Sequence, residues 1–141
     1  MVNPFSSRIH FRNTGLLILR LGYGLSFAFI HGLPELLGGY DRWEALGRKM
    51  TYVGIDFWPV MWGLSAALAE TFGGLLIAIG WVTKPAAGFL AFTMIVAAAM
   101  HLGQGEGLPG ASHALEALVI FIALIFTGSG KYSLEQYLLD Q

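Results

Sequence analysis

The sequence predicts an all-α integral membrane protein, an antiparallel bundle of four transmembrane helices that forms one domain over residues 1–141. Hydrophobic residues make up 55% of the chain and charged residues only 12%, whereas soluble proteins carry about 25% charged residues. The mean hydropathy is +0.63. Four apolar segments each approach the ~20 residues that cross a bilayer as a helix. They are residues 15–33, 58–81, 85–102 and 112–127.

The composition also excludes several classes of function. The formal net charge of -1 provides no basic surface, so we expect no nucleic-acid partner. The chain contains no cysteine, which excludes disulfide exchange, thiolate catalysis and cysteine-ligated clusters by this chain alone. Any thiol chemistry would therefore belong to a partner protein.

The basic residues between the spans predict an orientation. One side of the membrane would carry Arg8, Arg12, Lys84 and Lys131. The other side would carry Arg42, Arg48 and Lys49. Because basic residues favour the cytoplasm, the excess predicts that both termini lie there.

Two helices are predicted outside the spans. In the first connection, apolar residues recur at helical spacing: Trp43, Leu46, Met50 and Val53. The charged residues of this segment lie elsewhere on the wheel: Arg42, Glu44, Arg48 and Lys49. This pattern is typical of a helix lying on the membrane surface. Ser133 and Gln136 have the spacing of a capping box, which predicts a short C-terminal interfacial helix.

Glu70 is the main candidate for a functional residue, since an unpartnered carboxylate near the middle of a span is expensive. At ~1.5 Å per residue, Glu70 and Glu116 lie ~18 Å, and His31 and His101 ~24 Å, from the cytoplasmic ends. Helical side chains lean toward their N-terminus, which brings the acids and imidazoles together. Arg20 shares the face of His31, two turns lower. We therefore expect one pocket with Glu70 as the catalytic residue and His31, His101, Glu116 and Arg20 as binding residues.

Structural roles are the alternative for each of these residues. His31 and His101 lie near helix ends, where histidine often bonds a carbonyl or water, and His113 is expected at the interface. Glu116 could stabilise the positive end of its helix. Glu70 could be a protonated acid or pair with arginine or histidine.

Several short motifs occur in a specific order. They are Arg20, His31-Gly32, Ala69-Glu70 with Gly73-Gly74, and the closing run Gly128-Ser129-Gly130-Lys131-Tyr132-Ser133-Leu134. Together they resemble the DoxX family of small four-helix bacterial membrane proteins, over residues 15–135. Two positions depart from the pattern: Glu35 stands where many relatives have lysine, and Glu135 replaces the closing aspartate.

The resemblance implies a location in the bacterial cytoplasmic (inner) membrane and an association with redox enzymes. Relatives include the membrane subunit of a thiosulfate:quinone oxidoreductase, and others are linked to oxidative-stress and thiol systems. The leading hypothesis is therefore a redox-associated membrane subunit, part of a quinone-linked oxidoreductase, whose polar layer binds a quinone or similar small redox molecule. Histidine can donate to a quinone oxygen and Glu70 can exchange the proton, while a redox partner protein supplies electrons.

Two other functions stay open at this point. His31, Glu70, His101 and Glu116 are residue types that could hold iron, zinc or manganese in a bundle, although the Glu-x-x-His spacing is absent. The chain could instead be a small transporter or a structural partner subunit of a membrane complex. Small-residue helix faces also permit a homo-oligomer.

Overall fold

The computed structural model describes residues 4–141, with side chains from residue 11 onward, so the side chain of Arg8 lies outside the described part. Within this part the chain is helical and has no strand. Four helical stretches are long and apolar enough to cross a membrane. They are Phe11–Leu37, Pro59–Ile79, Thr83–Gly103 and Gly107–Thr127. The predicted all-α bundle with four spans is confirmed, and the protein is a multi-pass membrane protein.

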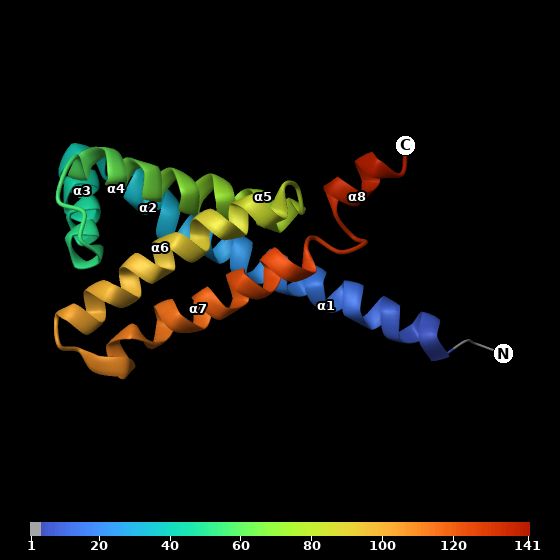
Figure 1. Cartoon of the computed structure of the whole chain (residues 1–141). Coiled ribbons are helices and arrows are strands. Elements are labelled where there is room, and N and C mark those ends of the chain that lie inside the picture. Colours follow the sequence, from blue (N-terminus) through green and yellow to red (C-terminus); the bar gives the residue numbers. More distant parts are fainter. Residues whose placement is uncertain (1–3) are drawn as a thin grey trace.

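Each of the first two spans is built from three consecutive segments (Figure 1). The first contains α1 (Pro4–Ser26), the π-helical segment η1 (Phe27–Gly32) and α2 (Leu33–Leu37). The second contains α4 (Pro59–Leu68), the π-helical segment η3 (Ala69–Gly73) and α5 (Gly74–Ile79). A π-helical turn holds one extra residue and shifts the hydrogen-bond ladder, which changes the direction of the side chains that follow.

The third and fourth spans are the regular helices α6 (Thr83–Gly103) and α7 (Gly107–Thr127), which form an antiparallel hairpin. The buried residues of α7 recur every three or four positions: Ala111, Ala114, Ala117, Phe121 and Leu124. This spacing keeps one face of α7 against α6 and the opposite face outside. Phe27, Ile77 and Leu90 join this face to make the main apolar core.

Glycine lets other helices pack backbone against backbone. A Cβ atom on Gly24 of α1 would lie 2.6 Å from the carbonyl oxygen of Gly74 on α5. A Cβ atom on Gly63 of α4 would overlap the backbone of Trp43. Small residues allow such close approach within lipid, where helix association depends on van der Waals packing. α1 is thus tied to α5, and α4 to the connection that precedes it.

The first connection is helical, as predicted, and consists of α3 (Gly39–Gly47) and the 3₁₀ segment η2 (Arg48–Val53). Its apolar residues face the bundle, since Met50 is buried and Leu46 lines an internal cavity. Lys49, which the helical wheel placed on the polar face, also turns toward this cavity. The reason is that a 3₁₀ helix turns by about 120° per residue, so the α-helical periodicity ends at Arg48.

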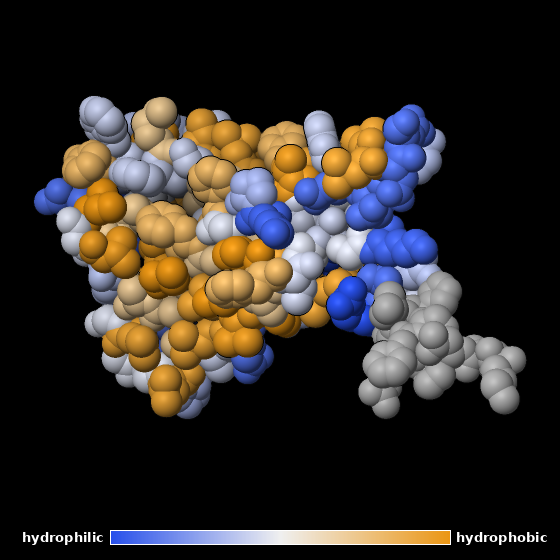
Figure 2. All heavy atoms as spheres, turned by 45° about the vertical axis from the view of Figure 1, so that its right-hand side comes forward, coloured by the Kyte–Doolittle hydropathy of each residue, from blue (hydrophilic) through white to orange (hydrophobic). Residues whose placement is uncertain are grey.

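The predicted C-terminal helix is α8 (Leu134–Leu139). The backbone N–H of Gln136 donates to the Ser133 hydroxyl at 3.2 Å, which confirms the predicted start. The backbone N–H of Glu135 donates to the carbonyl of Gly80, so α8 is held at the α5–α6 turn. Figure 2 shows apolar side chains over the body of the bundle and hydrophilic side chains gathered at one end.

Candidate functional site

A cavity of about 810 Å³ lies beside Glu70. It is bordered by η1, α4, η3 and α6, and the segment formed by α3 and η2 covers one end. Most of its wall is apolar, including Phe27, Trp62, Phe89 and Phe92. The ionisable and hydroxyl side chains in the wall are His31, Glu35, Lys49, Ser65, Glu70, Thr93, His101 and His113. An apolar pocket of this volume with a few convergent polar groups is typical of small-molecule sites.

Glu70 lies in η3 and is only 7% exposed. The opposite π-helical segment, η1, approaches η3 closely because Gly32 has no side chain, and a Cβ atom there would overlap the backbone of Thr71. The carboxyl group of Glu70 interacts with Glu35, Lys49 and the side chain of Thr93. The π-helical turns therefore place Glu70 within a polar group drawn from four segments.

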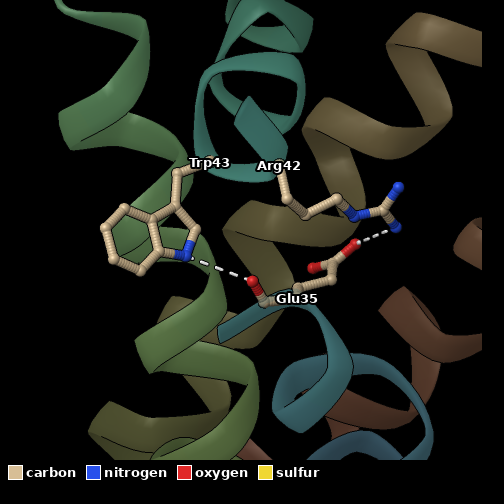
Figure 3. Close-up of polar contacts among 3 residues, drawn as sticks. All are labelled: Glu35, Arg42 and Trp43. Atoms are coloured by element: carbon tan, nitrogen blue, oxygen red, sulfur yellow. Dashed lines mark hydrogen bonds and ion pairs between the residues drawn. The ribbon is translucent and has the colours of Figure 1, made fainter. Parts of the chain in front are cut away.

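Glu35 supplies a second buried carboxyl group, from α2. Its Oε1 atom accepts from Arg42 at 3.3 Å, whereas Oε2 is buried and has no hydrogen-bond partner among the described residues. The indole N–H of Trp43 donates to the backbone carbonyl of Glu35 at 3.1 Å (Figure 3). Arg42 and Trp43 thus hold α2 on α3 from two sides. The Oε2 atom of Glu35, a residue of the cavity wall, can therefore bond a group inside the cavity.

Sequence reasoning noted Glu35 only as a departure from the family pattern and did not place it in the pocket. A signal was available, because His31 and Glu35 are four residues apart in one helical stretch. Residues at this spacing share a helix face. Lys49 and Thr93 were also missed, and nothing in their local pattern marks them.

The histidines reach the cavity from three different segments. The rings of His31 and His113 stack with their centroids 5.4 Å apart. The ring of Phe27 also contacts His31, with a centroid distance of 5.1 Å. His113 was expected only at the interface, yet it lines the cavity. His101 also lines it, while its Nδ1 atom lies 2.6 Å from Glu106 Oε2 in the α6–α7 turn. His101 therefore connects the cavity wall to this turn.

Two of the five predicted pocket residues lie elsewhere. Glu116 is exposed on α7 and is absent from the cavity wall, because it falls beside rather than on the buried face of this helix. Arg20 is fully buried near the α5–α6 turn, where its guanidinium donates to the backbone carbonyl of Tyr132 and interacts with Glu135. The expected pocket thus contains Glu70, His31 and His101, and Glu35 rather than Glu116 is its second carboxyl group.

The arrangement does not form the metal site considered from the sequence. Across residues 11–141, no three His, Asp or Glu side chains are placed to hold one ion. Glu116 lies outside the cavity wall that His31, Glu70 and His101 share, and His101 is paired with Glu106. What the polar group can do is bind oxygen atoms of a ligand and exchange protons through two neighbouring carboxyl groups.

Comparison with known proteins gives one finding. A model of the DoxX family matches residues 15–102, which is more than half of the chain and includes η1, η3 and most of α6. No curated protein and no solved structure matches. The matched range contains every wall residue of the cavity except His113 and Ala114.

Proposed function

The chain belongs to the DoxX family and has four spans, and we propose that it is a redox-associated membrane subunit that binds a quinone or similar redox molecule beside Glu70. One observation carries this proposal. Two buried carboxyl groups, Glu70 and Glu35, meet at the wall of a cavity of about 810 Å³ that is otherwise mostly apolar. This combination suits a ligand with an apolar body and a few oxygen atoms that take up protons.

The wall provides matching groups for such a ligand. Phe89, Phe92 and Trp62 offer flat apolar surfaces for a ring. His31 can donate a hydrogen bond to a carbonyl oxygen of the ligand. His31 and Glu70 line the same cavity, so one ligand can contact both side chains.

Reduction of a quinone to a quinol takes up two electrons and two protons. The electrons would come from an electron-donating partner protein, since this chain has no cysteine to supply them. Glu70 would give a proton to the ligand oxygen and take another from Glu35. Glu35 contacts Arg42, whose side chain is 56% exposed, so Glu35 can regain its proton from water beside Arg42. The second proton would follow the same route.

The distribution of charge supports an inner-membrane location with both termini in the cytoplasm. Arg12, Lys84 and Lys131 come together around a polar cavity at the end of the bundle that carries the termini. Basic residues gathered at one end favour the cytoplasmic side.

The test is binding of a quinone with a ten-carbon tail to the purified full-length protein, measured by quenching of tryptophan fluorescence, since Trp62 lines the cavity. We expect Glu70→Gln to weaken binding several-fold, because an amide N–H is a weaker donor to the ligand oxygen than a protonated carboxyl group. The matched control is Glu116→Gln, the same change at a glutamate outside the cavity, which should bind as wild type.

Turnover gives the second readout. In native membranes with the partner present, Glu70→Gln should lower quinone-dependent electron transfer about 10²-fold or more while the amount of protein stays constant. Unchanged binding and turnover in Glu70→Gln, or equal losses in Glu116→Gln, would contradict the proposal.

A further inference from the structure

Two helices that border the cavity do not pack closely on each other. The cavity wall includes Ser65 and Ala66 on α4 and Phe89 and Phe92 on α6. α6 packs on α5 and η3, but α4 packs on α3 and is not among the elements in close contact with α6. Figure 1 shows the two helices running apart in the direction of α3. The space between them is therefore the candidate opening of the cavity toward the lipid.

This opening lies within the hydrocarbon region. At ~1.5 Å per residue, Ser65 is ~9 Å from the start of α4, at the end of the bundle that carries α3. Phe89 and Phe92 are ~9–14 Å from the start of α6, which lies at the opposite end, so the wall residues extend along the depth of the membrane. The hydrocarbon core is about 30 Å thick, so these positions face acyl chains. Phe89 is 67% exposed and Phe92 44% exposed, which places aromatic side chains at the edge of the opening.

The end of the cavity toward the α3 side is covered by protein. η2 packs on α6, and the side chain of Met50 in η2 is buried. Tyr52 packs against Gly103 at the end of α6, where a Cβ atom would overlap the tyrosine ring. Gly47 at the end of α3 packs against the backbone of Pro59. The connection is therefore fixed to α4 and to α6, and it closes this end.

We propose that the ligand enters sideways from the bilayer between α4 and α6, and that it carries a long apolar chain which remains in this opening. The inference rests on the proposed function for the chemistry at Glu70. It adds the path by which the ligand enters and the requirement for a long apolar chain on the ligand. A water-soluble ligand would have to cross the hydrocarbon region to reach the opening. A polyprenyl quinone is already dissolved there, and its headgroup would move inward while its chain stays among the lipids.

The test narrows the opening from each side. Ser65→Trp adds bulk at an exposed wall position of α4, and Gly88→Phe adds it on α6, where nothing lies within 4 Å of an added Cβ atom. The control is Leu68→Trp, on the exposed surface of α4 and outside the cavity wall. Each purified variant is titrated with a long-tailed polyprenyl quinone and with the same quinone ring lacking a tail.

The expected result is that Ser65→Trp and Gly88→Phe weaken binding of the long-tailed quinone at least tenfold while the tail-less quinone and the Leu68→Trp control stay at wild-type affinity. Equal effects on both quinones, or wild-type binding of the long-tailed quinone in both variants, would overturn the side route. Failure of both quinones to bind the wild-type protein would instead overturn the proposed function. A variant that does not purify as a folded protein is replaced by the other, since either side of the opening suffices.

Discussion

The chain buries charged side chains in two places, and these places differ in the space around them. Arg20 is fully buried and tightly surrounded: a Cβ atom added at Gly80 would overlap its guanidinium and lie 2.6 Å from Ser133. Glu70 is 7% exposed and lies on a cavity of about 810 Å³. Burial of a charge alone does not separate a structural role from a binding role, whereas free volume beside the charge does.

The partners differ in the same way. Arg20 holds a distant part of its own chain through the carbonyl of Tyr132 and through Glu135. Glu70 interacts with Glu35, a group of like charge, which contributes nothing to stability when both are ionised. The first arrangement fastens the C-terminal segment, and the second is suited to exchanging protons.

The largest effect is expected for Arg20→Ala. Removing a fully buried side chain leaves a void and breaks its hydrogen bond to the Tyr132 carbonyl, which should lower the free energy of unfolding by about 2–4 kcal/mol. Thermal unfolding in detergent micelles measures the loss, and limited proteolysis should show early cleavage after residue 127. Arg12→Ala, at an exposed arginine on the same helix, is the control. Equal stability of the two variants would show that Arg20 does not fasten this segment.

A medium effect is expected from one substitution made in both places. Gly80→Ala puts a methyl group against Arg20 at a backbone φ of 73°, so we expect a loss of about 1–3 kcal/mol. Gly88→Ala puts the same group into the open cavity side of α6, where helix propensity improves by about 0.5–1 kcal/mol. The measurement is the unfolding temperature of each variant. A lower value for Gly80→Ala and a higher value for Gly88→Ala would support the contrast between tight packing at Arg20 and open space at the cavity, whereas a lower value for both variants would contradict it.

The smallest effect on stability is expected for Glu70→Gln. The amide keeps the shape of the carboxyl group, and the adjacent cavity leaves room for it, so stability should change by less than about 1 kcal/mol. Thermal unfolding of this variant beside Arg20→Ala measures the contrast. If Glu70→Gln lost as much stability as Arg20→Ala, Glu70 would be a structural residue.

The spans could be predicted from the sequence because the bilayer imposes one length and one polarity on every crossing helix. The start of α8 could also be predicted, since Ser133 caps it by a local hydrogen bond. The ends of the spans were less well predicted where they depend on tertiary packing. The first span was expected to end at residue 33 but continues past Pro34 to Leu37. The reason is that η1 has already shifted the hydrogen-bond ladder before the proline.

Depth in the membrane could be estimated from the sequence, but the rotation of each helix could not. Counting residues placed Glu116 at the depth of Glu70, yet only the buried face of α7 shows that Glu116 points outward. The π-helical turns that direct His31 and Glu70 leave no clear sequence pattern. Lys49 enters the cavity through the change from α to 3₁₀ geometry, which the periodicity of the segment did not reveal.

The glycine contacts differ between the two halves of the bundle. Backbone contacts such as those of Gly24 and Gly63 join α1 to α5 and α3 to α4, whereas the α6–α7 hairpin meets these helices mainly through side chains. The chain passes from α5 to α6 through a short turn in which Gly80 and Val82 both have positive φ, 73° and 44°. A β-branched residue rarely adopts this conformation, so Val82 stores backbone strain that the packing around the turn must offset.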